Sequence, residues 1–170
     1  MKRLFDLSLA VPGLILLSPL FGLIGLLIKL HDGGAIFFRQ ERVGKHGRSF
    51  GILKFRTMVD DAERLGLQIT SGEDRRITPI GSCLRRLKLD ELPQLINVIR
   101  GEMSLVGPRP EVPKYVALYS PEQRRVLDVQ PGITDPASLQ YFSESELLHS
   151  ADDAETVYVT QIMPEKLRLN

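Results

Sequence analysis

Residues 7–28 read LSLAVPGLILLSPLFGLIGLLI, a run of 22 residues with 15 apolar side chains and no charged one. A straight helix of this length extends roughly 33 Å, enough to cross a hydrocarbon layer of ~30 Å. A secretory signal peptide has a shorter apolar region of about 7–15 residues, followed by a small-residue cleavage site. The run is longer and ends without an Ala-x-Ala pattern. It therefore predicts a membrane helix that is not cleaved.

Two features of this run argue against a simple span. Ser18 and Pro19 lie in its middle, where the proline bends a helix and the serine hydroxyl can bond the backbone carbonyl that the proline leaves free. Basic residues lie on both sides, at Lys2 and Arg3 before the run and at Lys29 after it, so positive charge gives no clear orientation. We expect either a re-entrant helix broken at Ser18–Pro19 or a single kinked transmembrane anchor. A buried core helix of a soluble protein is a third possibility.

The other 148 residues contain all 43 charged side chains, or 29% of their number, and a length of 170 fits one domain with an appendage. The net charge of +1 argues against a nucleic-acid partner held by a general basic field. One cysteine, Cys83, excludes a disulfide framework, and no Cys/His cluster has zinc-ligand spacing. We expect a membrane segment at 1–30 joined to a single globular domain at 31–170.

Short motifs in the globular part predict a mixed, mostly helical domain. Apolar, aromatic-rich runs at 35–39 and 50–55 flank a basic, turn-rich loop at 43–48, which indicates a β-hairpin. In an extended strand Lys54 and Arg56 project to one face, where they serve either function or protection of a sheet edge.

Helices are expected at several places further along the chain, with rigid proline loops between them. A helix from Asp90 would tolerate Pro93 in its first turn and end at Gly101. The other expected helices are a surface helix at 58–67, helices at 111–118 and 121–127, and two helical stretches after Glu144; the loops are 107–110 and 131–136. The fold class is thus α+β and mostly helical, with an N-terminal re-entrant membrane helix, a small β-hairpin, and amphipathic and globular helices.

Asp90–Glu91 is the densest acidic point beside a basic run, because Arg85, Arg86 and Lys88 precede it. The simple explanation is that Asp90 caps a helix and Glu91 favours its dipole. Carboxylates among fixed cations near a helix N-terminus also suit phosphate chemistry, in which cations hold phosphate oxygens and a carboxylate attacks or holds a metal.

Arg109 lies in Gly107-Pro-Arg-Pro110, a stiff loop that is suited to hold a planar guanidinium against phosphate. An ordinary exposed arginine on a proline turn is the alternative. The sequence has no G-x-S-x-G nucleophile motif, Walker loop or dinucleotide fingerprint. Composition and spacing alone indicate a monotopic protein that handles phosphate with a carboxylate pair, and they name no substrate.

Four ordered blocks resemble the bacterial sugar transferase family, the monotopic phosphoglycosyl transferases or polyprenyl-phosphate hexose-1-phosphate transferases. The blocks are KFRTM at 54–58, LDELPQL at 89–95 with Asn97 and Val98, GEMSLVGPRP at 101–110, and PGIT at 131–134. With KRLFD at 2–6, the resemblance covers most of the chain. Four blocks in this order are far more specific than a lone Gly-Pro-Arg-Pro.

The resemblance implies an enzyme on the cytoplasmic face of the bacterial inner membrane. Its donor would be a nucleoside-diphosphate sugar, usually a UDP-sugar, and its acceptor a polyprenyl phosphate such as undecaprenyl phosphate. It would transfer the sugar 1-phosphate, release UMP and initiate surface polysaccharide or glycan assembly. The alternatives are a catalytically idle, membrane-anchored partner-binding module and a membrane phosphohydrolase.

The resemblance also implies roles for individual residues. Asp90 resembles the nucleophile that forms an aspartyl phosphosugar, and Glu91 resembles the ligand of a catalytic Mg²⁺. Arg85 and Arg109 resemble phosphate-binding arginines, and Lys54 is a weaker candidate for the same role. Ser18–Pro19 matches the break of the family's re-entrant helix.

The chain departs from the family pattern after residue 129. Gln130 replaces a common arginine, and Asp135–Pro136 replaces a common Gly-Trp. Donor contacts made by that region in relatives are therefore not expected to carry over. Relatives commonly continue past the position of Asn170 with a further helix.

Overall fold

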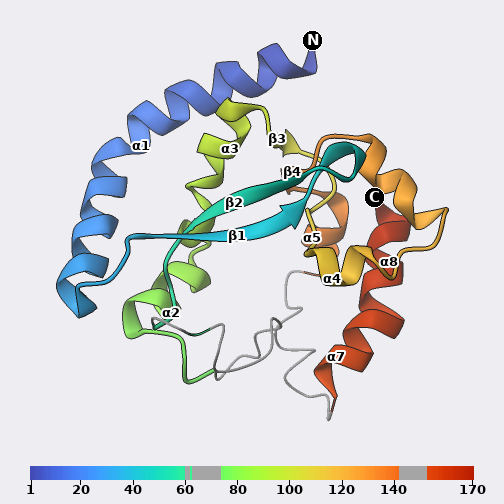
Figure 1. Ribbon diagram of the computed structural model, residues 1–170. Coiled ribbons are helices and arrows are strands. Elements are labelled where there is room, and N and C mark those ends of the chain that lie inside the picture. Colours follow the sequence, from blue (N-terminus) through green and yellow to red (C-terminus); the bar gives the residue numbers. More distant parts are fainter. Residues whose placement is uncertain (60–61, 63–73, 142–152) are drawn as a thin grey trace.

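The computed structural model describes residues 1–59, 62, 74–141 and 153–170. Its first element, α1, is a continuous helix over Lys2–Asp32, and Figure 1 shows that its ribbon bends about halfway along. Pro19, near the middle of this range, cannot donate to the carbonyl of Ile15, and Ser18 Oγ donates to that carbonyl instead at 2.7 Å. The expected break is therefore a bend within one helix, and the expected role of the Ser18 hydroxyl is confirmed.

Most apolar side chains of α1 lie on the surface of the described structure. An 18-residue window of the helix has a mean hydropathy of 2.3, and only 17% of it is buried. Leu16 is 80% exposed and Ile15 is 69% exposed. A core helix of a soluble protein would be mostly buried, so this exposure argues against that possibility. By length and composition α1 can cross a membrane.

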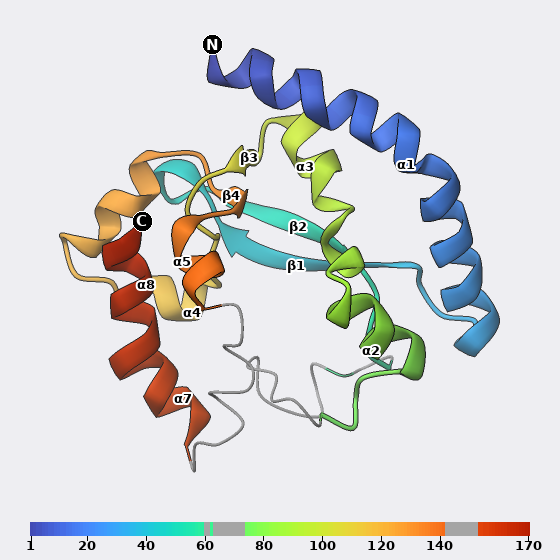
Figure 2. The same cartoon turned by 180° about the vertical axis from the view of Figure 1, so that it is seen from behind.

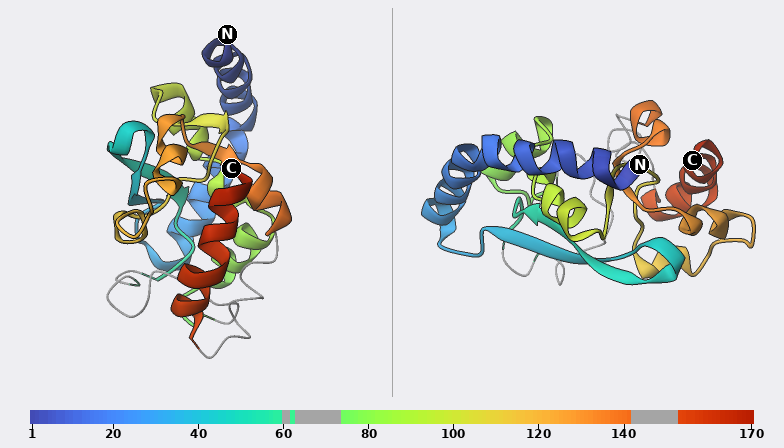
Figure 3. Two further views of the ribbon diagram at one scale, coloured as in Figure 1. Left: turned by 90° about the vertical axis from the view of Figure 1, so that its right-hand side faces the viewer. Right: turned by 90° about the horizontal axis from the view of Figure 1, so that it is seen from above.

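Three layers make up the centre of the fold. The strands β1, Phe37–Val43, and β2, Ser49–Phe55, form an antiparallel hairpin in which Phe37 lies opposite Phe55. Figure 3 shows α3, Gln94–Arg100, between this hairpin and α1. Ala10 of α1, Ile52 of β2 and Val98 of α3 meet in one buried cluster, because each element turns an apolar face to the middle layer. The predicted hairpin is confirmed.

The predicted end of α3 is confirmed and its predicted start is wrong. Gly101 ends the helix with φ 84°, a left-handed conformation that favours glycine. The helix does not begin at Asp90, because residues Leu89–Glu91 form a separate 3₁₀ turn. Leu92 N donates to the carbonyl of Leu89 at 3.3 Å and closes this turn, after which α3 begins at Gln94.

A second, parallel two-stranded sheet was not predicted. Its strands are β3, Ser104–Val106, and β4, Gly132–Thr134 (Figure 2). A Cβ on Gly132 would lie 2.1 Å from the Gly107 nitrogen, so the two segments pack backbone against backbone. The segment 131–136, expected to be only a rigid turn, therefore begins with a strand.

The remaining helices are short. Within the described ranges they are a 3₁₀ helix, Lys45–Gly47; α2, Pro79–Arg86; α4, Pro113–Val116; a 3₁₀ helix, Gln123–Asp128; α5, Pro136–Gln140; α7, Ala154–Val157; a π-helical turn, Tyr158–Ile162; and α8, Met163–Leu169. The predicted helices at 111–118 and 121–127 are thus shorter or of 3₁₀ type. The predicted helix at 58–67 lies almost wholly outside the described residues, and Met58 itself forms a β-bridge with Ile77. The first predicted helical stretch after Glu144 also lies outside them, and the later one corresponds to α7–α8.

The N-terminal end of α1 is tied to α3 and β3. The guanidinium of Arg3 donates to the carbonyl of Ile99 at 2.7 Å. The buried Asp6 carboxylate accepts from Ser104 Oγ at 2.9 Å and from the backbone N–H of Leu105 at 3.1 Å. These polar residues hold the start of the apolar helix against the globular domain.

The C-terminal end of α1 is tied to the same domain. Asp32 forms an ion pair with the buried Arg56, which follows β2. Gly33 ends the helix in a left-handed conformation, with its N–H bonded to the carbonyl of Lys29 at 3.0 Å. Both ends of this 31-residue helix therefore contact one globular body.

Candidate active site

A cavity of about 700 Å³ lies among the Gly107–Pro110 loop, α5 and α8. Its charged lining residues include Arg42, Lys88, Glu91 and Arg109. Its aromatic lining consists of all four tyrosines of the chain, Tyr115, Tyr119, Tyr141 and Tyr158. This volume and this mixture of aromatic and charged groups are typical of small-molecule sites.

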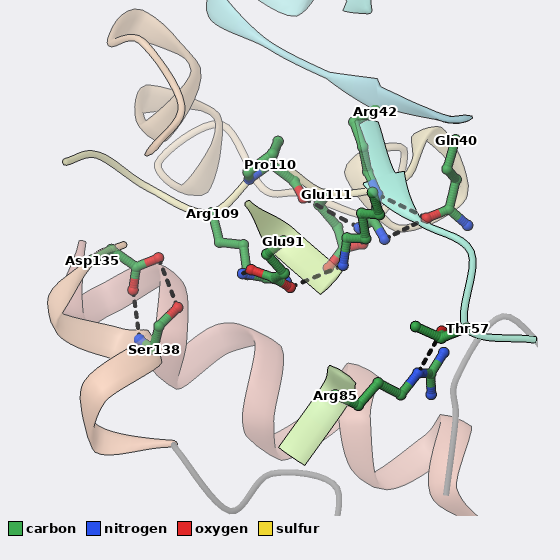
Figure 4. Close-up of polar contacts among 11 residues, drawn as sticks. Gln40, Arg42, Thr57, Arg85, Glu91, Arg109, Pro110, Glu111, Asp135 and Ser138 are labelled. Atoms are coloured by element: carbon green, nitrogen blue, oxygen red, sulfur yellow. Dashed lines mark hydrogen bonds and ion pairs between the residues drawn. The ribbon is translucent and has the colours of Figure 1, made fainter. Parts of the chain in front are cut away.

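Glu91 is the centre of the charged group. Lys54 Nζ lies 2.9 Å from Glu91 Oε1. Arg109 contacts both carboxylate oxygens, with Nη2 on Oε1 and Nη1 3.1 Å from Oε2 (Figure 4). Burial alone would raise the pKa of Glu91, but the ion pairs with Lys54 and Arg109 outweigh it and hold the pKa well below its usual range. The structure thus brings the predicted residues Lys54, Glu91 and Arg109 together around an ionised carboxylate.

Asp90 has the opposite electrostatic character. Its side chain is buried, and burial raises its pKa against the attraction of Lys54. Asp90 Oδ1 is enclosed and has no hydrogen-bond partner in the described part of the chain. The simple explanation of Asp90 as a helix cap is wrong, because α3 begins after Pro93 and has no side-chain cap. Neighbouring carboxylates therefore have pKa values displaced in opposite directions, which is typical of sites that separate two catalytic roles.

Arg85 lies apart from the Glu91–Arg109 pair (Figure 4). Its Nε donates to Thr57 Oγ1 at 2.8 Å. Burial lowers the pKa of Arg85, and the negative charge of Asp90 is the first influence that opposes this. The charges of Arg85 and Asp90 therefore attract each other, and Thr57 holds the Arg85 side chain in place. Thr57 was not among the predicted site residues.

The spacing of Lys54 and Arg56 suggested one shared site, but the structure gives the two residues different partners. β2 ends at Phe55, so the alternation of side chains stops before Arg56. Lys54 contacts Glu91, whereas Arg56 pairs with Asp32 at the end of α1. Arg56 thus has a structural contact.

A second charged group supports the Arg109 loop and was missed by the sequence interpretation. Arg42 Nη1 donates to Glu111 Oε1 at 3.1 Å and to the carbonyl of Pro110 at 3.2 Å. Gln40 Oε1 accepts from the same guanidinium at 2.7 Å (Figure 4). The hydroxyl of Tyr158 donates to Glu111. A charged pair within β1, at Glu41 and Arg42, was the available signal, but no local spacing links it to Glu111.

The departures from the family pattern have structural roles. Asp135 is buried and caps α5, accepting from Ser138 N at 2.6 Å and from Ser138 Oγ at 3.0 Å. Ser138 and Leu139 line the cavity. The side chain of Gln130 donates to the carbonyl of Gly101, at the end of α3.

The residues at this site fit a magnesium ion. The described residues contain no group of three or more potential metal-binding side chains, so the protein would not enclose the ion. Mg²⁺ is commonly held by one or two carboxylates together with substrate phosphates and water. Glu91 supplies an ionised carboxylate that lines the cavity.

Comparison with known proteins identifies the family. Residues 1–164 match the sequence model described as "Bacterial sugar transferase". The chain belongs to this family. The match covers the layered core and every charged residue described above, and it ends at the start of α8.

Relatives of this sugar transferase include proteins with named activities. The exopolysaccharide production protein ExoY of Sinorhizobium fredii is 44% identical over 148 residues, which cover 78% of this chain and 66% of ExoY. The undecaprenyl-phosphate glucose phosphotransferase of Komagataeibacter xylinus is 47% identical over 81% of this chain and 27% of that protein. The UDP-N-acetylgalactosamine-undecaprenyl-phosphate N-acetylgalactosaminephosphotransferase of Aeromonas hydrophila is 43% identical over 78% of this chain and 32% of its own length. The chain thus spans two thirds or less of these relatives.

Proposed function

We propose that this sugar transferase moves a sugar 1-phosphate from a UDP-sugar to a polyprenyl phosphate such as undecaprenyl phosphate, and so initiates surface polysaccharide assembly. The observation that carries the proposal is the Asp90–Glu91 pair, whose two carboxyl groups have pKa values displaced in opposite directions beside Lys54 and Arg109. The names of the relatives support the acceptor and the phosphotransfer. They name different sugars, so the sugar stays open.

The proposed reaction consists of two displacements at one phosphorus atom. A carboxylate oxygen of Asp90 attacks the sugar-bearing phosphorus of the donor, the bond from that phosphorus to UMP breaks, and UMP leaves with the electron pair. An oxygen of the polyprenyl phosphate then attacks the same phosphorus, and Asp90 leaves as a carboxylate. Arg109 and Lys54 hold the phosphate oxygens, and the raised pKa of Asp90 makes its ionised form a stronger nucleophile.

In this proposal Glu91 is the protein ligand of Mg²⁺. When bound, the ion neutralises charge on the diphosphate and improves UMP as a leaving group. Lys54 and Arg109 keep Glu91 ionised down to low pH, so it remains a competent ligand across the physiological range.

The proposal also places α1 in the membrane as a re-entrant helix, with the domain on the cytoplasmic face of the inner membrane. Two observations support it: Asp6 and Asp32, near opposite ends of α1, both contact the same globular body, and the ribbon bends between them (Figure 1). A span across ~30 Å of hydrocarbon would separate those ends. Single cysteines at positions 2 and 31, on a Cys83→Ser background, should react with a membrane-impermeant maleimide from the same side. Labelling from opposite sides would exclude re-entry.

The test of the reaction is UMP release from a panel of UDP-sugars, with Mg²⁺ and undecaprenyl phosphate, by the full chain in lipid nanodiscs. We expect continuous release by the wild type, and without the acceptor a burst of no more than one UMP per enzyme. Asp90→Asn should abolish both, while Asp128→Asn, a change at an exposed carboxylate, should leave both intact. Continuous UMP release without the acceptor would indicate a phosphohydrolase, and none under any condition would indicate an idle module.

A further inference from the structure

Three buried side-chain atoms lack a hydrogen-bond partner in the described ranges, and all belong to two residues. They are Asp90 Oδ1, Gln94 Nε2 and Gln94 Oε1. The side chain of Gln94 is completely buried. An unsatisfied buried polar group destabilises a protein, so such groups in native proteins need an explanation.

Asn97 shows that buried side-chain amides of α3 do not in general lack hydrogen-bond partners. It is as deeply buried as Gln94 and lies one helical turn later. Its Nδ2 donates to the carbonyl of Gly51 at 2.9 Å, and its Oδ1 accepts from the N–H of Leu53 at 3.0 Å. Asn97 therefore joins α3 to β2, whereas the side chain of Gln94 makes no hydrogen bond with the described residues.

Gln94 lies little more than one turn of the chain after Asp90. The two residues are four apart, and the chain between them winds in a right-handed sense, with Leu92 at φ −54°, ψ −35° and Pro93 at φ −59°, ψ −16°. Leu92 N and Ile96 N donate to carbonyls three residues earlier, so the winding is of 3₁₀ type and the two side chains lie on successive turns. Their unpaired groups are complementary, because an amide N–H is a donor and an ionised carboxylate oxygen is an acceptor.

The two oxygens of Asp90 are not equivalent. The carboxylate accepts no hydrogen bond from the described residues, yet only Oδ1 is completely enclosed. Oδ2 is therefore the oxygen that reaches the surface. A donor on Oδ1 would fix the carboxylate rotamer and leave Oδ2 as the reactive atom.

We propose that Gln94 is a positioning residue for the nucleophile: one water bridges its Nε2–H to Asp90 Oδ1, since neither atom has a direct partner among the described residues, and this bridge directs Oδ2 at the donor phosphorus. The pairing itself needs no substrate, and its catalytic consequence rests on the proposed function. As Oδ2 bonds to phosphorus and UMP leaves with the electron pair, Oδ1 becomes the carbonyl oxygen of the mixed anhydride and keeps the bridging water as its donor. In the second step the Oδ2–phosphorus electron pair returns to the carboxylate, and the same water stabilises the charge on Oδ1.

A double-mutant cycle tests the pairing without requiring activity. The full chain in lipid nanodiscs is melted as wild type, Gln94→Met, Asp90→Leu and the double variant. We expect Gln94→Met to lower Tm when Asp90 is present, because the carboxylate loses its donor. In the Asp90→Leu background it should leave Tm unchanged or raise it, because only an unpaired amide is removed. An equal rise in both backgrounds would overturn the pairing.

Gln94→Glu is the second variant, and it keeps the side-chain shape while replacing the donor with an acceptor. At pH 8 it should lower Tm more than Gln94→Met does, and Asp90→Leu should remove this difference. Gln161→Met, at an exposed glutamine, is the control. It should leave Tm unchanged both in the wild type and in the Asp90→Leu variant. Should Gln94→Met fail to fold, the Gln94→Glu cycle still decides, because a loss of Tm that does not depend on Asp90 refutes the pairing.

Steady-state UMP release tests the catalytic consequence. A hydrogen bond to a charged group contributes about 1.5–3 kcal/mol, so Gln94→Met should lower kcat by roughly 10- to 100-fold. KM for the UDP-sugar with the fastest wild-type release should change less than about twofold, because Gln94 acts through Asp90 and does not touch the donor. An unchanged kcat would refute the positioning role. If the wild type releases no UMP while the melting cycle shows coupling, the proposed function fails and the pairing stands.

Discussion

Asp6 should be among the residues whose loss destabilises this protein most. It is 4% exposed, and it accepts hydrogen bonds from the hydroxyl of Ser104, which is 1% exposed, and from the N–H of Leu105. Asp6→Ala removes the acceptor and leaves both donors unpaired at about 1–3 kcal/mol each. Because Leu105 N is only partly buried, we expect a total near 3 kcal/mol. For a chain of this size each kcal/mol lowers Tm by about 2–4 °C, so the expected loss is roughly 6–12 °C.

The assay is thermal unfolding of the full chain in nanodiscs, followed by far-ultraviolet circular dichroism. Ser8→Ala is the matched control on the same helix, because the Ser8 hydroxyl makes only a local, exposed bond to the carbonyl of Phe5. We expect the control to change Tm by no more than about 2 °C. If Asp6→Ala lowers Tm no more than Ser8→Ala does, the Asp6 contacts do not fasten α1 to β3.

Three further predictions concern the site and the bend. The pKa of Asp90 is raised above its ordinary value of 3.8, so above pH 3.8 the charged carboxylate destabilises the folded protein. Asp90→Asn should therefore raise Tm at pH 7, and this gain should vanish near pH 3. No gain at pH 7 would contradict the reasoning. Ser18→Ala should lower Tm by a few degrees when Pro19 is present but not in a Pro19→Ala background, where the restored N–H bonds the Ile15 carbonyl; equal losses would refute the compensation. Arg109→Lys keeps the positive charge but loses the bidentate geometry of the guanidinium, so the rate of UMP release should fall about 10-fold. An unchanged rate would show that catalysis does not need the bidentate contact.

Features that depend on neighbouring residues were predictable. The turn-rich segment between two apolar runs predicted the hairpin, because strand propensity and turn chemistry act over a few residues. Gly101 predicted the end of α3 through its tolerance of positive φ. The Ser18 hydroxyl was expected to bond the carbonyl freed by Pro19, since both residues lie on the same turn of helix.

Other features depended on contacts between distant residues. Pro93 was expected inside a helix that begins at Asp90, but Leu89–Glu91 forms a separate 3₁₀ turn and α3 begins only at Gln94. The pairing of β3 with β4 joins segments about 28 residues apart and relies on the close approach of Gly107 and Gly132. Lys54 and Arg56 looked like one basic pair, and their partners in the fold separated them.

By itself the sequence determined that an uncharged helix of membrane length precedes a charged α+β domain, and its motif order identified the family and the candidate residues. Only the tertiary structure decided how those residues differ. It placed Glu91 between two cations and enclosed Asp90 Oδ1 away from every direct hydrogen-bond donor of the described residues, although the two residues are adjacent in the chain. The reason is that a pKa depends on burial and on charges within a few ångströms, and here those charges come from residues 18 and 37 positions away.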